Sequence, residues 1–277
     1  MSDMKKKVLK IAVWTFAVAT LMACSSVAFT GRNRLLLYSD SEIAALSDQS
    51  YNEMMQTTVL SSDAARTAMV KEVGQKLSAA LSQYLSSKGQ SSVLDNINWQ
   101  FSLVKDEQVN AFCMPDGKVV FYEGIMPMLD TPDLVAVVMG HEMGHAVARH
   151  GNERMTQQAL VSLVGSVTGD VVEQKTSETG RALFEAAFAI GSEYGILLPY
   201  SRKHEYEADE IGLYIMAIAG YDITQAPLLW KKMSESGGQP IPEFMSTHPS
   251  DAKRIKNLEK LQSKASKYVT TNSQTIK

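Results

Sequence analysis

Residues 141–145 read His141-Glu142-Met143-Gly144-His145, within residues 132–150, whose spacing predicts one continuous helix. Residues four apart in a helix project from the same side, so His141 and His145 present two imidazole rings on one face, with Glu142 beside them. This pattern is typical of a site in which two histidines hold zinc and the carboxylate takes a proton from the attacking water. A five-residue match also occurs by chance, so the remaining chain has to complete the site.

The two histidines continue an apolar stripe that begins with Leu134 and Val138, which places them on the buried face of the helix. Gly140 and Gly144 lie in the helix interior, where each costs about 1 kcal/mol relative to alanine. Close approach of another element, such as a strand or a substrate chain, would explain both glycines. Tight helix packing would explain them equally well, and the sequence leaves these alternatives open.

The composition describes an ordinary folded protein with room for one large domain or two small ones. The chain has 277 residues, of which 45% are hydrophobic and 21% are charged. Its net charge of −3 gives no support to nucleic-acid binding, which requires a basic face. Two cysteines, Cys24 and Cys113, exclude a scaffold built on several disulfide bonds.

Residues 1–23 are predicted to be the signal peptide of a lipoprotein. Lysines precede an apolar run over residues 11–22, which as a helix would span only about 18 Å of the roughly 30 Å hydrocarbon core of a membrane. The run ends Leu21-Met22-Ala23-Cys24, similar to a bacterial lipobox with lipid on the Cys24 thiol. The alternatives are an N-terminal membrane anchor or an ordinary cleaved signal. We expect an exported, lipid-anchored protein, and Ser25 after the cysteine favours the outer membrane, facing the periplasm.

The rest of the chain is predicted to form one α+β domain over residues 41–268, between a polar, irregular tether at 24–40 and a flexible tail at 269–277. Alternating residues predict a strand at 99–104, and two more strands are expected at 109–113 and 118–122, where a tight turn makes them a hairpin just before the 132–150 helix. The fold is therefore expected to be mostly helical, with a small β-sheet or hairpin packed beside that helix. Further helices are expected at about 43–54, 64–85, 156–168, 181–198, 203–219, 222–235 and 250–264. The 181–198 segment is interpreted as a packed or lid-like helix, with membrane contact as the alternative.

A hydrolytic zinc site usually has three protein ligands, so a third must lie elsewhere in the chain. His150 stands one residue short of the position used in the metzincin pattern, and we assign it a structural or surface role. Glu205 and Asp209 are four apart on a predicted helix and share one face. Glu205 is a candidate ligand and Asp209 a candidate acceptor for the free N–H of a ligand histidine, but both are equally explained as solvated acids at a helix start. Glu207 lies on another face and is the weaker ligand candidate.

The combination of these motifs resembles the M48 family of zinc metallopeptidases. The histidine motif is followed by Ser201-Arg202-x-x-Glu205-x-x-Ala208-Asp209, which matches that family's second motif. The stretch Asn110-Ala111-Phe112 is similar to the family's strand before the catalytic helix, and Ser246-Thr247-His248-Pro249 to its C-terminal His-Pro segment. The resemblance covers most of the mature chain and is closest to the soluble or lipid-anchored periplasmic members and the similar mitochondrial inner-membrane quality-control protease.

This resemblance implies a zincin-like fold and a metalloendopeptidase that carries one zinc ion per chain. His141, His145 and Glu205 would be the ligands. Glu142 would act as the general base, and Asp209 would support a ligand histidine.

The resemblance also implies roles for two further segments and a class of substrate. His248 would either donate a hydrogen bond to the developing oxyanion or bind zinc as a removable fourth ligand, and a purely structural role in the turn is the alternative. Asn110, Ala111 and Phe112 would bind an extended substrate by strand addition. The substrates would be unfolded or misassembled exported or membrane-associated proteins. The competing functions are a zinc-containing chaperone or scaffold that binds such proteins without cleaving them, and a zinc hydrolase of non-peptide substrates.

Overall fold

The computed structural model describes residues 24–167, 181–182, 184, 201–235, 244, 248 and 252–272. The predicted signal peptide, most of the predicted 181–198 helix and the end of the predicted tail lie outside the described residues. The fold is mostly helical with two small sheets, so the predicted α+β class is confirmed.

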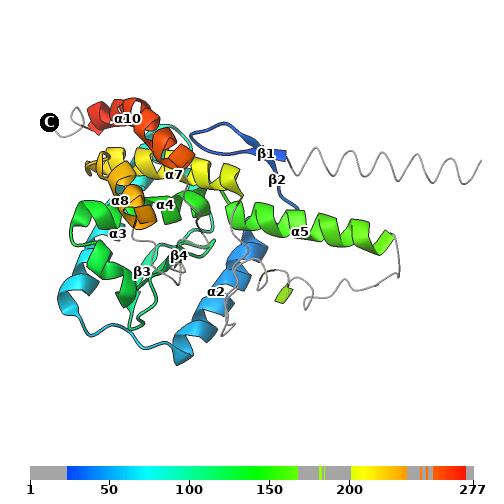
Figure 1. Ribbon diagram of the computed structural model, residues 1–277. Coiled ribbons are helices and arrows are strands. Elements are labelled where there is room, and N and C mark those ends of the chain that lie inside the picture. Colours follow the sequence, from blue (N-terminus) through cyan, green and yellow to red (C-terminus); the bar gives the residue numbers. More distant parts are fainter. Residues whose placement is uncertain are drawn as a thin grey trace, which may run out of the picture.

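The elements follow one another along the chain as in Figure 1. The helices are α2 (Asp40–Thr57), α3 (Ala64–Ser87), α4 (Pro132–Val147), α5 (His150–Val167), α7 (Arg202–Ala219), α8 (Gln225–Glu235) and α10 (Ala252–Asn272), with short 3-10 helices at Ser91–Leu94 and Glu123–Met128. The strands are β1 (Cys24–Ser26), β2 (Asn33–Leu35), β3 (Gln100–Val104), β4 (Ala111–Cys113) and β5 (Lys118–Tyr122). Because α10 runs to Asn272, the last helix continues into the segment predicted to be a flexible tail.

The larger sheet has the strand order β3-β5-β4 and lies beside α4 (Figure 1). Strands β4 and β5 pair antiparallel as the predicted hairpin, and their turn contains Gly117 with φ +91°, a conformation that favours glycine. Strand β3 pairs parallel to β5 on its other side. The central strand β5 is almost entirely buried, and β4 is the strand with the most contacts to α4, the helix that carries His141 and His145.

Helices α4 and α7 cross with their backbones in contact, and glycine makes this approach possible. A Cβ atom on Gly144 would lie 2.7 Å from the carbonyl oxygen of Ala208, and one on Gly212 would lie 2.8 Å from the carbonyl carbon of Gly140. The element that the helix glycines accommodate is therefore α7. The crossing brings the first turns of α7, which carry Glu205, against the histidines of α4.

The prediction of one helix over residues 132–150 is wrong at its end. Helix α4 stops at Val147, and a new helix, α5, begins at His150. Between them Arg149 has φ +54°, which breaks the helical path, and its side chain forms an ion pair of 2.7 Å with Asp40. The break redirects the chain, so helical periodicity does not give the position of His150.

The structure also differs from the predicted tether. Residues 24–35 form a hairpin in which β1 and β2 pair antiparallel, and Figure 1 shows it beside α7. Val27 is buried in the main core, and Phe29 stacks on Tyr84 with ring centroids 5.7 Å apart. The composition of this segment resembles that of an irregular linker. Its polar residues include Arg32 and Arg34, whose side chains have partners elsewhere in the domain.

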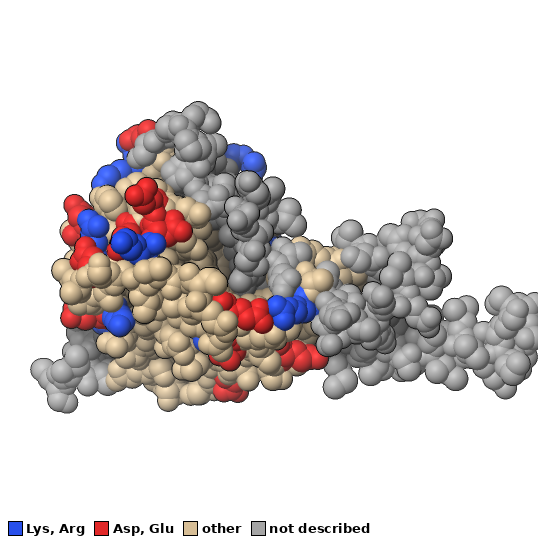
Figure 2. Space-filling model, turned by 90° about the horizontal axis from the view of Figure 1, so that it is seen from below, with Lys and Arg blue, Asp and Glu red and all other residues tan. Residues whose placement is uncertain are grey.

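The surface of the described chain carries mixed charges. On the face shown in Figure 2, acidic and basic side chains are interspersed over the described residues. The large exposed hydrophobic side chains of the described residues lie in the loops at Leu37, Val59 and Leu60 and on the helices α8 and α10 at Leu228 and Val269. Within the described part of the chain, no helix has both the length and the hydropathy needed to cross a membrane.

Candidate metal centre

Four buried side chains from three parts of the chain converge between α4 and α7. His141 and His145 come from α4, Glu205 from the first turn of α7, and His248 from the segment that precedes α10. Their donor atoms all lie within 4.8 Å of one another. The Nε2 atoms of His141 and His145 are 3.1 Å apart, and each is 3.4 Å from a Glu205 oxygen. The structure thus brings together the three predicted ligands and adds His248 as a fourth donor.

The chemistry of this group fits a zinc ion. Nδ1 of His248 lies 3.1 Å from Nε2 of His141 and 3.2 Å from Oε1 of Glu205, so several lone pairs point into one small space. Oε2 of Glu205 is fully buried; it makes an ion-pair contact of 2.9 Å with Nη1 of Arg254 but no hydrogen bond of good geometry. Buried polar atoms are normally paired, and a cation at the centre would satisfy these donors together. Imidazole nitrogen and carboxylate oxygen in a four-donor cluster are ligands that zinc prefers.

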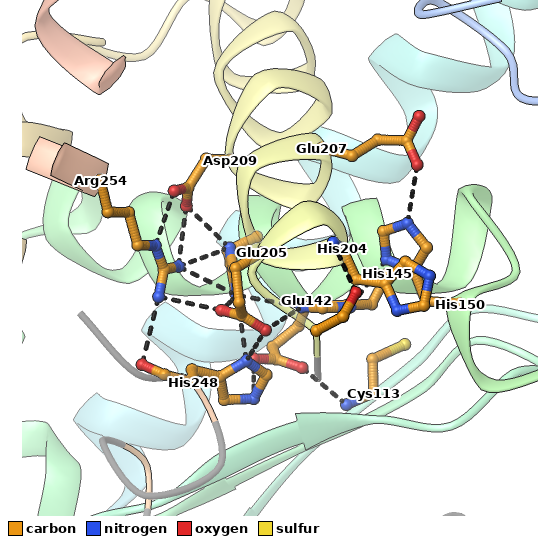
Figure 3. Close-up of polar contacts among 12 residues, drawn as sticks. Cys113, Glu142, His145, His150, His204, Glu205, Glu207, Asp209, His248 and Arg254 are labelled. Carbon is orange, nitrogen blue, oxygen red and sulfur yellow. Dashed lines mark hydrogen bonds and ion pairs between the residues drawn. The ribbon is translucent and has the colours of Figure 1, made fainter. Parts of the chain in front are cut away.

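Asp209 lies where the sequence predicted it, behind a ligand histidine. Its Oδ1 is 3.0 Å from Nδ1 of His141, on the side of the ring that faces away from the metal group. Figure 3 shows Asp209 held in turn by Arg254, whose Nε and Nη2 donate at 2.7 and 2.9 Å. This contact fixes the orientation of the His141 ring, as a carboxylate partner does for metal-binding histidines.

The sequence prediction missed the role of Arg254. Its guanidinium is 1% exposed, lies 2.9 Å from Glu205, donates to the carbonyl oxygen of His248 at 3.1 Å, and stacks 3.7 Å above the Trp230 ring. A signal existed in the helical spacing of α10, because a charged residue at 254 occupies the same stripe as three buried apolar side chains. These are Leu258, Leu261 and Ala265. A cation on a buried stripe indicates buried anionic partners.

Glu142 is held beside the donor group by the edge strand β4. Its Oε2 accepts a hydrogen bond of 3.1 Å from the backbone N–H of Cys113 (Figure 3). Its Oε1 is buried, has no hydrogen-bond partner, and lies 3.4 Å from Nε2 of His248. Burial raises the pKa of Glu142, which favours proton uptake. One oxygen is therefore fixed by the backbone and the other is free to accept a proton.

The neighbouring charges set the protonation of the donors in opposite directions. Burial alone would raise the pKa of Glu205, but His248 and Arg254 outweigh it and hold that pKa well below its usual range. Burial lowers the pKa of His145, so its ring is neutral, as a metal ligand must be. For His141 burial lowers the pKa, but the adjacent carboxylates outweigh this effect and raise it to about 9. Ligation of a cation would displace that proton.

His150 is structural, and the alternative of a surface position is wrong. The ring is fully buried, with Nδ1 2.9 Å from Nδ1 of His145 and Nε2 2.9 Å from Oε2 of Glu207. Burial lowers the pKa of His150 to about 4. His204 stacks on this ring with centroids 4.4 Å apart. Glu207, on the other face of α7 from Glu205, is a partner of His150 and lies outside the four-donor group (Figure 3).

The remaining predicted site residues lie at the edge strand and at the start of the described chain. Asn110 and Ala111 are buried and Phe112 is half-buried, at the edge of the sheet beside α4. Cys24 is the first residue of β1.

Comparison with known proteins identifies relatives of this fold and site. Residues 64–262 match the model of peptidase family M48. "Mitochondrial metalloendopeptidase OMA1" of Arabidopsis thaliana is 40% identical over 167 residues, which are 60% of this chain and 32% of that protein. The human "Metalloendopeptidase OMA1, mitochondrial" is 30% identical over 84% of this chain and 44% of its own length. "Beta-barrel assembly-enhancing protease" of Escherichia coli is 26% identical over 63% of this chain and 37% of its own length.

The chain spans between about a third and a half of the length of the curated relatives it matches first. The family match, in contrast, covers most of this chain, from the start of α3 into α10. Peptidases of this family use zinc, in agreement with the four-donor group of the structure. The chain belongs to peptidase family M48.

Proposed function

We propose that this protein is a zinc-dependent endopeptidase whose zinc ligands are His141, His145 and Glu205. The observation that carries the proposal is the convergence of buried histidine and carboxylate donors within 4.8 Å of one another, next to a buried glutamate with one free oxygen. Membership of a metallopeptidase family supports the same reaction. A zinc ion bound here would supply a Lewis acid that polarises the scissile carbonyl and makes water more acidic.

Glu142 is the proposed general base. The Cys113 N–H holds Oε2 of Glu142, so the carboxylate has a fixed orientation and its Oε1 lies beside His248 of the donor group. Its raised pKa matches a group that takes a proton from water and passes it to the leaving amine. Asp209 and Arg254 keep the His141 ring in place while this proton moves.

The edge strand β4 is the proposed binding site for the substrate backbone. Hydrogen bonds between β4 and β5 involve Asn110 and Met114, so by the alternation of a strand the backbone groups of Ala111 and Cys113 face away from the sheet. The outward N–H groups have acceptors in the structure, Oε2 of Glu142 for Cys113 and Oδ1 of Asn110 for Ala111, so a peptide that pairs with this edge would compete for these donors next to the proposed general base. An extended peptide that pairs with this edge would pass the general base with little dependence on its sequence. Unchanged peptide affinity after replacement of Phe112 would count against this assignment.

His248 is the proposed removable fourth ligand. Its Nδ1 belongs to the donor group, whereas a donor to the oxyanion would have to leave that space to the substrate. His248→Ala should therefore raise the initial rate of cleavage of a short unstructured peptide. A loss of about 10²- to 10³-fold in kcat, as expected for removal of an oxyanion donor, would instead support the alternative role in transition-state stabilisation.

The proposed substrates are unfolded or misassembled exported or membrane-associated proteins. Support comes from the names of the relatives, which are a beta-barrel assembly-enhancing protease and metalloendopeptidases of mitochondria. The sequence of residues 1–24 supports export and a lipid on Cys24, with the outer membrane facing the periplasm as the proposed location. Retention of the protein in the detergent phase, and its loss from that phase in Cys24→Ser, would test the anchor.

The experiment that tests the proposed reaction is digestion of unfolded casein by the zinc-loaded protein and by Glu142→Gln. The substitution keeps the shape of the side chain and removes the base, so cleavage should fall by about 10²- to 10⁴-fold while zinc content stays the same. Full proteolysis by Glu142→Gln would contradict the mechanism. Wild-type protein that binds casein without cleaving it would identify a chaperone or scaffold instead.

A further inference from the structure

The two histidines of the catalytic helix receive their outer support in different ways. His141 contacts the carboxylate of Asp209 directly, at 3.0 Å. His145 instead faces a second imidazole, because its Nδ1 lies 2.9 Å from Nδ1 of His150. The two rings stand nearly perpendicular, with centroids 4.9 Å apart and an interplanar angle of 74°.

Hydrogen-bond geometry fixes the tautomers of this pair when His145 is a metal ligand. Its Nε2 belongs to the donor group, so the ring hydrogen must be on Nδ1 and is donated to Nδ1 of His150. His150 then carries its hydrogen on Nε2 and donates it to Oε2 of Glu207, at 2.9 Å. The rings thus form a directed chain of hydrogen bonds from the metal group to a carboxylate, in which each nitrogen has one role.

The chain continues to the N-terminal hairpin. Glu207 accepts from Oγ1 of Thr30 at 2.5 Å and from Nε of Arg32 at 2.7 Å. Arg32 also makes two parallel hydrogen bonds to Glu153 of α5, at 2.8 and 2.7 Å. A guanidinium held by two carboxylates in this way has a defined position and orients both of them.

Two further contacts hold the hairpin against the same region. Nη1 of Arg34 donates to the carbonyl oxygen of Ala148, which lies in the break between α4 and α5, midway between His145 and His150. Val27 is 2% exposed and belongs to the main core. The hairpin therefore contacts both the backbone and the side chains that determine where His150 lies.

We propose that His150 is a positioning residue for the metal ligand His145, and that the hairpin of residues 24–35 anchors it through Arg32, Thr30 and Glu207. The inference rests on the proposed ligation of zinc by His145. It adds to that function a dependence of the metal site on the segment that immediately follows Cys24. Displacement of the hairpin would release Glu207, free the His150 ring to turn, and loosen the ligand geometry.

The first test compares two substitutions of His150 in the full mature chain. His150→Phe keeps a ring that stacks on His204 but has no nitrogen, and zinc affinity measured by competition with a chelator should fall by about 10- to 100-fold. His150→Asn places an oxygen acceptor near the position of Nδ1 and should recover part of that loss. With Co²⁺ as a spectroscopic probe, the visible absorption bands should change in His150→Phe and return toward wild type in His150→Asn. Zinc affinity within twofold of wild type and unchanged Co²⁺ bands in His150→Phe would overturn the proposal.

The second test addresses the hairpin. Arg32→Gln should weaken zinc binding, whereas Arg66→Gln, which removes an exposed ion pair with Asp63 on α3, should leave it unchanged. The thermal unfolding curve of each metal-free variant gives a temperature at which that variant is folded. Zinc affinity measured at that temperature separates a loss of metal affinity from a loss of fold. Equal zinc affinity of the two arginine variants would remove the hairpin from the proposal. Failure of the wild-type protein itself to bind zinc would refute the proposed function, which is a different outcome.

Discussion

Replacement of Arg254 by methionine tests the electrostatic basis of the metal centre. The guanidinium is the cation between two buried carboxylates, with Asp209 at 2.7 and 2.9 Å and Glu205 at 2.9 Å. Methionine fills a similar volume and keeps the contact with Trp230, so the main loss is the charge. Removal of one partner from a buried ion pair costs about 3–5 kcal/mol, because the remaining carboxylates stay buried without compensation. At about 2–4 °C per kcal/mol for a chain of this size, the melting temperature should fall by about 6–20 °C.

The assay is thermal and urea unfolding of the metal-free protein, with Lys264→Met as the matched control on the same helix. Lys264 lies 3.7 Å from Glu210, and its side chain is 63% exposed, so its loss should cost less than about 1 kcal/mol. Saturation with zinc should reduce the stability difference between Arg254→Met and wild type without removing it. In the variant the metal replaces Arg254 as the cation beside Glu205, but Asp209 has no such replacement. A deficit no larger than that of the control would show that the buried carboxylates do not depend on Arg254, and the reasoning would be refuted.

Two further predictions concern the helix crossing and the acid limit of stability. In Gly144→Ala the new Cβ would lie 2.7 Å from the carbonyl oxygen of Ala208, on the helix that carries Glu205, so we expect lower zinc affinity. Overpacking should reduce the free energy of unfolding by about 1–3 kcal/mol. The higher helix propensity of alanine should offset up to about 1 kcal/mol of that loss. A stability gain with normal zinc affinity would contradict this. Burial raises the pKa of Glu153, but hydrogen bonds from His204 and Arg32 outweigh it and lower that pKa. The ionised Glu153 carboxylate therefore stabilises the fold above its unfolded pKa of about 4.3, and this stabilisation is lost as the pH falls below that value. Urea titrations at several pH values should show a smaller fall in the free energy of unfolding below about pH 4 for Glu153→Gln than for wild type. Identical slopes for the two proteins would contradict this prediction.

Local sequence patterns were sufficient for the parts of the site that lie on regular helices. The spacing of four between His141 and His145 places both rings on one face of α4, and the same spacing places Glu205 and Asp209 on one face of α7. The capping box that starts α2 at Ser39 and the alternation over β3 also follow from neighbours in the chain. These features depend on helical or strand geometry alone, which a sequence specifies directly.

Features that depend on distant partners were not predictable in this way. Arg32 pairs with Glu207 across 175 positions, so its polar segment has the composition of a linker although it forms an anchored hairpin. The break at Arg149 has no proline or glycine to mark it, and without it the position of His150 is assigned wrongly. Arg254 gave a weak signal as a charge on a buried stripe, but its meaning required the carboxylates of α7. In each case the physical cause is an ion pair or hydrogen bond between segments far apart in the chain.

The outer contacts of the metal group extend the functional unit beyond the part of the chain that matches the family. That match begins at residue 64, yet the support of His145 passes through His150 and Glu207 to Arg32, which lies before it. The support of His141 passes through Asp209 to Arg254, near the other end. One catalytic helix therefore has its two histidines braced from opposite ends of the chain. A chain that lacks only the hairpin of residues 24–35 would keep the proposed ligands, α2 and Arg254 but lose one of the two braces, so its zinc affinity should resemble that of Arg32→Gln rather than that of the full chain.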